Sequence, residues 1–596
     1  MTWRSSSPSR IWKLRAGRDS PTGPTFLSET GVAAAARGPG TNWQRALPFA
    51  WAAFLALLVT LPWLQPGYIF GTDWPGPRRF DLPHDLTSTA LLQVALAVVS
   101  RVLPAEVTGK LLVVSILFVA ALTAYEAAPT TLKIGFVPRA AASILYVFNP
   151  FVFGRLHYGQ LFLLAGYAVL PWVALRLRRL VLNPRVIQAL IAAVSLALLG
   201  ILSLHLLVVA GVLAVALVLT HTLAAKDRVA YLMRLGPVLL LMAAATLAAS
   251  AYWVVPLVTG RGPEGTVISG IGAGDLAAYA ASPDPQLGLL PNLLGLYGFW
   301  AEGTGRFTAM KHFVPLWPVA LGLLILVCAA GAVTSFRRNR DEAAPWVAGL
   351  LVAAAVGLVL EAGISQPITA VLVRWLDAIP IYRGMRDAGK YAALLALVYS
   401  QLFALGAAAV LDRIRTERRP QLNVDQLHGI ATGLLLALPL FYGNGLLFGM
   451  HGEIRPSQYP SGWYAADQYL QADGHPGRTL FLPWHEYMAY SFVRNQNRVV
   501  ASPAPTFFSS PMVVSADPEV PGIEARRTAD QVAISGLVSS GANGKWADVL
   551  ATRDVKYVLL AREVDWKSYS YLDQQIGLHV VSDYDSIILY RNTLVH

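Results

Sequence analysis

The chain has 596 residues, of which 55% are hydrophobic and only 14% are charged, and its mean hydropathy is +0.49. An average soluble domain carries roughly 25% charged residues, so this composition excludes an ordinary soluble enzyme and indicates a large helical membrane protein. The net charge of +12 does not point to nucleic acid, because the basic residues lie at the ends of apolar runs. The single cysteine, Cys328, excludes a disulfide framework and a thiolate metal site.

Residues 1–45 are rich in Ser, Pro, Gly and Arg. This composition lacks the apolar side chains needed for a core, so we predict a disordered, basic cytoplasmic tail. The tail is too long for the charged start of an ordinary signal peptide. We therefore expect the apolar run that follows it to be retained as the first membrane span.

About eleven apolar runs follow, each near the ~20 residues needed to cross roughly 30 Å of hydrocarbon. With the amino terminus in the cytoplasm, every cytoplasmic connection carries lysine or arginine, as the positive-inside rule requires. The sequence therefore predicts a polytopic transmembrane domain over residues 46–447. The runs are 46–65, 105–127, 138–153, 160–176, 186–203, 206–224, 231–258, 313–335, 344–362, 389–411 and 427–447.

The opposite, extracytoplasmic side receives the longer loops. The first runs from residue 67 to about 105 and includes an amphipathic stretch, 86–103, that we expect to lie along the membrane interface. A tight turn is predicted at 154–159 between the third and fourth spans. Two further loops are predicted at 259–312 and 363–388.

The chain changes character after Met450, where polar residues become frequent. Short runs rich in β-branched and aromatic residues predict strands, and residues 463–473 predict a helix between them. We therefore predict a small extracytoplasmic α/β domain over residues 448–596. The predicted strands are 479–484, 556–561, 579–583 and 586–590.

Residues 67–83 (GYIFGTDWPGPRRFDLP) directly follow the first span and are the first candidate for an active site. Ionisable residues at a membrane edge are expensive unless they have a function. Asp73 and Asp81 are each candidates for a general base, or for a ligand of a metal that holds a phosphate. The structural alternative is that loop aspartates cap the helix that follows, a role that suits Asp85.

A second cluster lies in residues 381–394 (IYRGMRDAGKYAAL), at the predicted outer end of the tenth span. Arg383, Arg386 and Lys390 are three cations on the side where the positive-inside rule expects few. Arg386 and Lys390 are four residues apart and would share one face of a helix. An anionic headgroup is the natural partner, because guanidinium binds phosphate in a bidentate way. The alternatives are a salt bridge with Asp387 or simple snorkelling.

The third element is residues 149–160 (NPFVFGRLHYGQ), in which Pro150 interrupts an apolar run. A proline there frees a backbone carbonyl, and Asn149 is placed to satisfy freed groups nearby. Polar side chains then crowd the predicted turn and are candidates to bind a phosphorylated or polyhydroxylated headgroup. Histidine in such a turn is also commonly no more than a hydrogen-bonded turn residue.

Aromatic residues such as Trp300, at the end of LLGLYGFW (293–300), are suited to stacking on sugars but also to the interfacial aromatic belt. The string GIGAGD (270–275) fails the dinucleotide fingerprint because it does not lie between a strand and a helix. No Walker phosphate-binding loop is present, which argues against an ATP-driven pump. The candidate substrate-binding residues are Arg78, Arg79, His157, Gln160 and Trp300, and Arg155 joins the phosphate-binding candidates.

Taken together, an acidic first outer loop, an interfacial helix behind it, many spans and a terminal α/β domain resemble the GT-C membrane glycosyltransferases. The strings NPFVFGRLHYGQ, AYWVVP, LYGFW and RGMRDAGKY resemble those of the actinobacterial mannosyl- and arabinofuranosyltransferases and of the YfhO-like integral membrane proteins. The resemblance covers roughly residues 46–596 and implies a bacterial cytoplasmic membrane, with the C-terminal domain outside the cytoplasm.

The resemblance also implies a reaction. Such enzymes pass a sugar from a polyprenyl-phosphate donor to a glycan, lipid or protein acceptor of the cell envelope. A first-loop aspartate acts as base on the acceptor hydroxyl, which corresponds to Asp73 here, although the family's usual paired form is absent. Basic residues near later spans hold the donor phosphate, which suits Arg383, Arg386 and Lys390. A divalent cation, Mg²⁺ or Mn²⁺, serves only some members and stays open.

Two other functions stay open. A transporter or flippase of lipid-linked glycans would need a polar path through the spans, yet these spans carry few ionisable residues at mid-depth. A non-catalytic scaffold that binds glycan would have much the same sequence. A requirement for Asp73 in catalysis separates the transferase from both.

Overall fold

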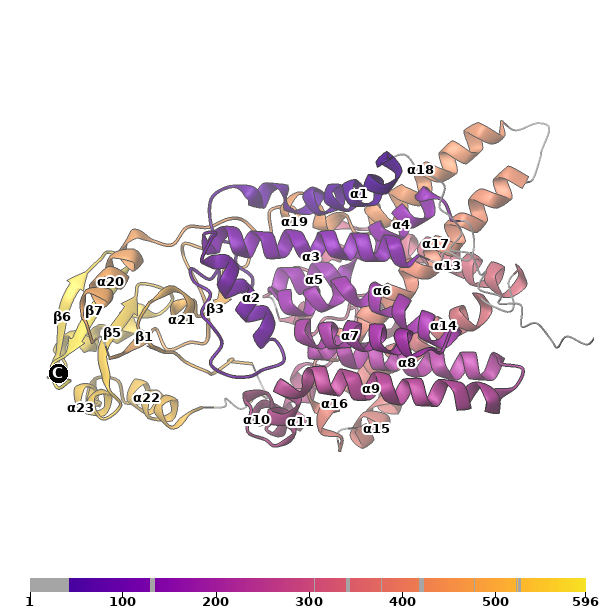
Figure 1. Ribbon diagram of the computed structural model, residues 1–596. Helices are drawn as coiled ribbons and strands as arrows, with labels where there is room; N and C mark the ends of the chain where they lie inside the picture. The colour runs from indigo at the N-terminus through magenta and orange to yellow at the C-terminus, as the bar shows by residue number, and fades with distance from the viewer. Residues whose placement is uncertain are drawn as a thin grey trace, which may run out of the picture. The chain divides into compact units, whose positions relative to one another are not determined.

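The computed structural model describes residues 42–128, 134–304, 306–338, 343–376, 378–416, 423–475, 477–520, 523 and 527–595. The predicted tail therefore lies almost wholly outside the described residues. Residues 48–596 form one unit of the structure. Figure 1 shows its long helices, followed toward the C-terminus by a sheet with short helices.

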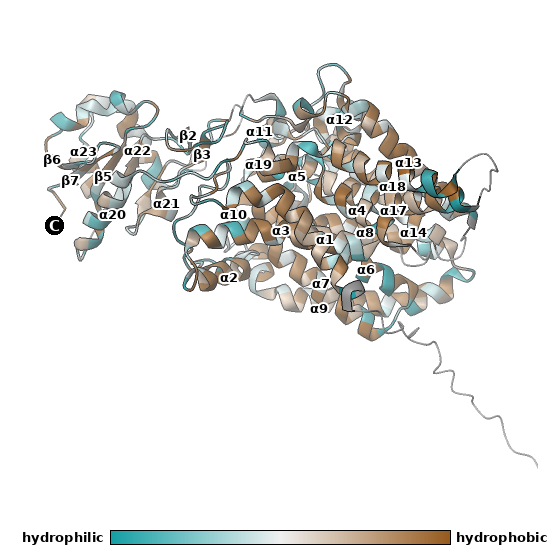
Figure 2. Cartoon of the chain, turned by 90° about the horizontal axis from the view of Figure 1, so that it is seen from above, coloured by the Kyte–Doolittle hydropathy of each residue, from teal (hydrophilic) through white to brown (hydrophobic). Residues whose placement is uncertain are grey.

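Long apolar helices dominate the first three quarters of the chain, and they are predominantly hydrophobic along their length (Figure 2). Within the described ranges, nine helices are long and apolar enough to cross a membrane. This confirms the prediction of a polytopic helical membrane protein. The nine are α1 (Asn42–Thr60), α3 (Ala105–Ala127), α6 (Leu161–Leu182), α8 (Leu204–Ala224), α9 (Arg228–Val258), α13 (Trp317–Arg338), α14 (Ala343–Ala362), α17 (Ala392–Thr416) and α18 (Val424–Tyr442).

The two remaining predicted spans have a different form. The third is a pair of helices, α4 (Phe136–Val147) and α5 (Pro150–Tyr158), bent by 41° at their junction. The fifth, α7 (Val186–Leu202), has only 17 residues. The predicted number of about eleven spans is therefore not confirmed among the described residues.

Helix α5 also corrects the predicted turn at 154–159, which is helical as far as Tyr158. The Asn149 side chain accepts a hydrogen bond from the Val152 amide and so caps α5, while Pro150 takes the first helical position. The Asn149 amide also donates to the carbonyls of Leu145 and Tyr146 at the end of α4. The Asn149 cap and Pro150 at the first helical position both favour the start of a new helix at the bend, because neither costs an intrahelical hydrogen bond there.

Helix α17 lies at the centre of the membrane domain, packed against α4, α13 and α14. Its crossing with α13 depends on two glycines. A Cβ added at Gly406 would lie 1.9 Å from the Val327 carbonyl oxygen, and one at Gly331 would lie 2.3 Å from that of Leu402. Small residues at a crossing let two helix backbones approach closely, which is the main source of helix association in lipid.

The loops predicted outside the membrane contain short helices. Helix α2 (Ala90–Ser100) falls within the stretch expected at the interface, and its N-cap residue is Thr89, so Asp85 does not cap it. The other short helices are α10 (Pro263–Ser269), α11 (Ala273–Ala278), α12 (Leu289–Leu294), α15 (Pro367–Leu376), α16 (Pro380–Arg383) and α19 (Leu447–Met450), with 3₁₀ helices η1 (Leu61–Leu64), η2 (Trp300–Gly303) and η5 (Ala388–Tyr391).

The C-terminal region forms a five-stranded mixed sheet in the order β4-β1-β5-β7-β6. Strand β1 runs parallel to β4 and β5, and β7 runs antiparallel to β5 and β6. All four predicted strands and the predicted helix are present, whereas β2, β3 and β4 were missed. The elements are β1 (Arg478–Leu482), β2 (Tyr487–Ala489), β3 (Val499–Ala501), β4 (Met512–Val513), β5 (Val555–Ala561), β6 (Leu578–Asp583), β7 (Ile587–Asn592), α20 (Ser461–Ala472), α21 (Ala504–Phe507), α22 (Ala529–Ser540) and α23 (Trp546–Ala551).

Both faces of this sheet are covered. Tyr557, Leu559 and Ala561 of β5 enter a cluster with Trp463 of α20. Val555, Val558 and Leu560 enter a cluster with Trp546 of α23. Every residue of β5 is therefore buried, as expected of a strand with a core on each side.

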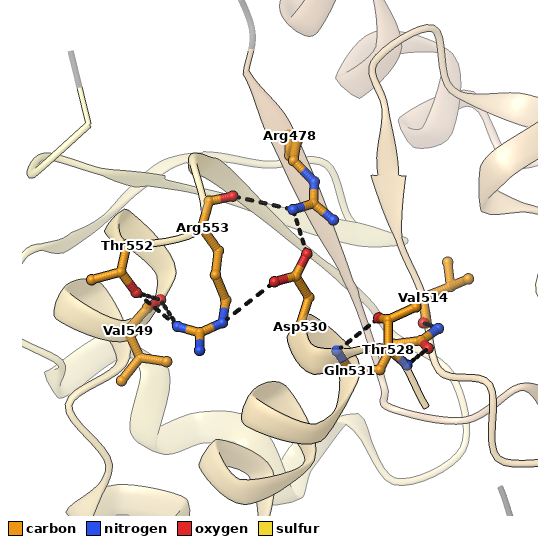
Figure 3. Close-up of polar contacts among 8 residues, drawn as sticks. All are labelled: Arg478, Val514, Thr528, Asp530, Gln531, Val549, Thr552 and Arg553. Atoms are coloured by element: carbon orange, nitrogen blue, oxygen red, sulfur yellow. Dashed lines mark hydrogen bonds and ion pairs between the residues drawn. The ribbon is translucent and has the colours of Figure 1, made fainter. Parts of the chain in front are cut away.

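Helix α22 is fixed to one end of the strands of this sheet by polar contacts (Figure 3). Asp530, in its first turn, accepts a hydrogen bond from Arg478 of β1 at 2.7 Å and pairs with Arg553 at 3.7 Å. Thr528 and Gln531 form a reciprocal capping box at the same end. This carboxylate therefore anchors one element to another.

Candidate active site

The first loop, residues 65–89, does not extend freely from the membrane domain. Phe70 is fully buried in the same hydrophobic cluster as Tyr459 and Trp463 of the C-terminal region. The Phe70 carbonyl accepts a hydrogen bond from Asn495, and Tyr459 donates to the carbonyls of Pro75 and Gly76. The first loop is thus part of the C-terminal core, and this fixes the position of the residues that follow Phe70.

The backbone around Asp73 is held on a second side by the end of α5. The Asp73 amide donates to the Tyr158 carbonyl at 2.7 Å. Gly159 adopts a φ of +81°, and a Cβ there would lie 2.7 Å from the Cβ of Trp74. A Cβ at Gly71 would lie 2.7 Å from the Gly159 Cα, so the two glycines permit a contact that no other residue pair allows.

The Asp73 side chain is held by two uncharged donors. Gln160 Nε2 donates to one carboxylate oxygen at 3.1 Å, and the Tyr487 hydroxyl donates to the other at 3.2 Å. Burial raises the pKa of Asp73 to about 6, although these hydrogen bonds and the nearby Arg155 act in the opposite direction. A carboxyl with this pKa is well matched to general-base catalysis near neutral pH.

Gln160 is itself oriented by a buried ion pair. Arg155 of α5 pairs with Asp387, and its guanidinium also donates to Gln160 Oε1 at 2.8 Å. Burial alone would raise the pKa of Asp387, but Arg155 and Lys390 hold it below its ordinary value. Five side chains thus form one continuous network, from Asp387 through Arg155, Gln160 and Asp73 to Tyr487.

Asp73 lies where two cavities meet. The larger has a volume of about 630 Å³ and is lined mainly by apolar residues of α6, α8 and α10 and the segments beside them, with Trp74 of the first loop. Ser88 and Glu264, which are hydrogen-bonded to each other, add a polar group to its wall.

The smaller cavity, of about 160 Å³, has a polar and aromatic lining. Tyr158 and Tyr279 each pack their ring edge to face with that of Trp300. Tyr487, Pro518 and Val520 of the C-terminal region form another part of the wall. The residues that line both cavities are Asp73, Gln160, Arg386 and Lys390.

Two cations, Arg386 and Lys390, therefore lie with Asp73 where the two cavities meet. Arg386 pairs with Asp275 of α11 at 2.7 Å, and Lys390 lies on η5, next to the Arg155–Asp387 pair. They do not share the face of one helix, because Arg386 precedes η5. The expected salt bridge of Asp387 is instead made with Arg155.

Other predicted residues lie away from both cavities. Asp81 is exposed and pairs with Arg79 at 3.0 Å, while Arg78 pairs with Asp467 and stacks on Tyr464 and Phe507. These three therefore attach the first loop to the C-terminal region or lie on its surface. Neither Arg383 nor His157 lines either of these two cavities, and His157 is buried with its Nε2 3.4 Å from Glu453.

Sequence reasoning missed the contributions of the C-terminal region. Glu486 precedes Tyr487, and burial, with Asp73 nearby, raises the pKa of Glu486 to about 7. In the sequence, the string PWHEYMAY (483–490) offers only aromatic residues and an adjacent His485 and Glu486, which are not at a zinc spacing. No local signal relates it to a loop more than 400 residues earlier.

The carboxylates of Asp73 and Asp387 are both engaged with protein groups. Both Asp73 oxygens accept hydrogen bonds from protein groups, and Asp387 is paired with Arg155. Among the residues that the structure describes, no three His, Cys, Asp or Glu side chains are grouped in a way that would hold a metal ion.

These features define a polytopic membrane protein with an α/β region at its C-terminus that contacts the first loop. No protein-family model and no curated protein matches the chain. Among solved structures, the chain is similar to the arabinofuranosyltransferase AftD from Mycobacteria. The TM-score is 0.56 at 16% identity, over 92% of this chain and 40% of that one.

Two structures of a mutant AftD give the same result. Their TM-scores are 0.55 and 0.54 at 18% and 17% identity, over 94% and 92% of this chain. The chain spans about two fifths of the length of these proteins. The likeness confirms the fold expected from the sequence.

Proposed function

We propose that the protein is a membrane glycosyltransferase that moves a sugar from a polyprenyl-phosphate donor to a cell-envelope acceptor. The observation that carries this proposal is the position of Asp73, between an apolar and a polar cavity and beside Lys390 and Arg386. A lipid-linked sugar has an apolar chain, a phosphate and a polar sugar, in that order. The apolar cavity, the two cations and the polar cavity follow the same order.

In the proposed reaction, the Asp73 carboxylate takes the proton of an acceptor hydroxyl in the polar cavity. The acceptor oxygen attacks the anomeric carbon of the donor sugar, and the bond from that carbon to the phosphate oxygen breaks. The phosphate leaves with the bonding electron pair, and Lys390 and Arg386 stabilise its charge. One displacement of this kind inverts the anomeric configuration.

The proposed setting is a bacterial cytoplasmic membrane with the site on the extracytoplasmic side. The basic connections support this orientation, because the ends of the spans near Asp73 are those that the positive-inside rule assigns to the outside. A donor carried by a lipid suits that side, where nucleotide sugars are not available. The acceptor is then a glycan, lipid or protein of the envelope.

The test uses a deletion strain complemented with wild type, Asp73→Asn or Asp530→Asn, followed by analysis of envelope glycans and lipid-linked sugars. We expect a truncated glycan and accumulated polyprenyl-phosphate sugar in the deletion and with Asp73→Asn, and rescue by wild type and Asp530→Asn. Asp530 is a matched control because it is a hydrogen-bonded aspartate far from the cavities. Full rescue by a correctly inserted Asp73→Asn would contradict the proposal and favour a scaffold or a transporter.

Donor binding is testable without knowledge of the sugar. Farnesyl phosphate, which carries an isoprenoid chain and a phosphate, should raise the Tm of the purified wild-type protein. The Lys390→Met protein should need about tenfold more farnesyl phosphate for the same rise in Tm, because one charge-assisted contact to the phosphate is lost. Arg383→Gln is the control, because Arg383 lies outside the lining of both cavities. Equal binding by the Lys390→Met protein would contradict the phosphate assignment.

A further inference from the structure

The C-terminal region reaches the proposed base through a two-stranded hairpin, β2–β3. Tyr487 begins β2 and is paired in register with Ala501 of β3. The Ala501 amide donates to the Thr72 carbonyl at 2.8 Å, one residue before Asp73 in the chain. A single hairpin therefore binds the backbone beside Asp73 and also places a hydroxyl on its carboxylate.

The opposite carboxylate oxygen is held by a donor whose orientation is fixed. A guanidinium can only donate hydrogen bonds, so the Gln160 atom that meets Arg155 must be the carbonyl oxygen. The amide nitrogen of Gln160 is then directed to Asp73. The buried Asp387 in turn holds Arg155, so the Gln160 amide cannot turn over without breaking this contact.

Each oxygen of the Asp73 carboxylate accepts one hydrogen bond from the protein and keeps further lone-pair capacity for a substrate hydroxyl. The two donors come from different regions, Gln160 from the membrane domain and Tyr487 from the C-terminal region. With either bond missing, the carboxylate is free to rotate about its terminal torsion, which is broad for aspartate.

We propose that Tyr487 and Gln160 are positioning residues that hold the Asp73 carboxylate for proton transfer, so that the site is complete only while the β2–β3 hairpin is docked on the first loop. This inference rests on the proposed function. The C-terminal region thereby controls the base directly, in addition to forming a wall of the polar cavity.

The test is the pH dependence of transfer by the full-length protein in lipid nanodiscs. The donors are farnesyl-phosphate-linked arabinofuranose and mannose, with octyl glycosides as acceptors, and released farnesyl phosphate is measured. A hydrogen bond to the carboxylate favours its charged form. Tyr487→Phe should therefore move the acidic limb of the rate profile upward by about one pH unit. The rate should fall about fivefold at pH 6 and much less at pH 8.5, and Gln160→Met should act in the same direction.

Tyr590→Phe is the matched control, because Tyr590 also donates to an aspartate, Asp573 at 2.8 Å, but in the C-terminal sheet. It should leave the profile unchanged. The titratable groups that face Asp73 or line its two cavities are Arg155, Tyr158, His205, Glu264, Tyr279, Arg306, Arg386, Asp387, Lys390, Glu486 and Tyr487. The Glu486→Gln variant removes the titration of Glu486, so any acidic limb that remains in it is that of another group such as Asp73. An acidic limb that disappears in Glu486→Gln and is unmoved in Tyr487→Phe would overturn the inference.

A second measurement is independent of turnover. Carbodiimide modifies protonated carboxyls, and mass spectrometry reports the labelling of Asp73 as a function of pH. The pH at which labelling of Asp73 is half-maximal should rise in Tyr487→Phe and stay unchanged in Tyr590→Phe. If wild type transfers no sugar, the proposed function fails, while an unmoved midpoint in an active protein shows that the positioning role is wrong.

Discussion

Asp73 and Asp530 are both hydrogen-bonded aspartates, but their surroundings differ in one respect that decides their roles. Asp530 is held directly by two guanidinium groups, those of Arg478 and Arg553, at a partly exposed end of the strands of the sheet. Asp73 is held only by the neutral donors Gln160 and Tyr487, with its cations one contact further away. A carboxylate neutralised by arginine is an anchor, whereas one held by neutral donors keeps its affinity for a proton.

The same contrast exists within the site itself. Asp387 belongs to the same hydrogen-bonded network as Asp73. Arg155 neutralises Asp387, however, and holds its pKa below the ordinary value. Burial without a direct cation raises the pKa of Asp73 instead. The Asp387–Arg155 pair thus acts as a support, and Asp73 is the residue left able to exchange a proton.

The largest expected effect comes from neutralising each aspartate in turn. Asp73→Asn should lower the rate of transfer by about 10²–10⁴-fold, the usual contribution of a general base. Asp530→Asn should change the rate by no more than about twofold. Steady-state rates of the two purified proteins make the comparison, and equal losses would show that Asp73 has no special chemical role.

The pH dependence of the wild type gives the next largest effect. Asp73 must be ionised to act as base, and its pKa is about 6. Transfer should therefore fall about tenfold per pH unit below pH 6 and level off above pH 7. A profile that stays flat down to pH 4.5 would mean that the carboxyl titrates in the ordinary range or takes no part.

Trp300→Ala tests the polar cavity rather than the base. Loss of a stacking surface should raise the KM for the acceptor about five- to tenfold, since aromatic contacts contribute about 0.5–1.5 kcal/mol beyond the area they bury. The farnesyl phosphate affinity should be unchanged, because Trp300 lines only the polar cavity. A loss of farnesyl phosphate affinity of the same size would show that Trp300 acts on the chain or phosphate of the donor rather than on the acceptor.

Stability should show the smallest effects, with opposite signs for the two aspartates. Arg553→Ala removes one partly exposed contact of Asp530 and should lower the free energy of unfolding by about 0–1 kcal/mol. Asp73 carries a raised pKa, so its ionised form destabilises the folded state at neutral pH and this penalty disappears as the pH falls below 6. Asp73→Asn should therefore slightly raise the Tm at pH 7.5, and a lowered Tm would show that the carboxylate has a structural role.

Several features were predictable from the sequence because their signal is local. A run of about 20 apolar residues can be stable in few places other than a bilayer, and alternating or continuous β-branched runs specify strands. Asp73 was a candidate for the same kind of reason, since an ionisable residue beside a membrane span needs a physical explanation. The sequence by itself therefore determined the class of protein and one member of the site.

Only the tertiary structure decided the partners of that residue. Asp387 and Arg155 are 232 residues apart, and Tyr487 lies 414 residues after Asp73. The residues read as a turn at 154–159 became a helix because the cap at Asn149 starts it and the buried pair with Asp387 makes Arg155 tolerable there. Side-chain charge is visible in a sequence, but whether a charge is neutralised, exposed or left reactive depends on which distant groups the fold brings against it.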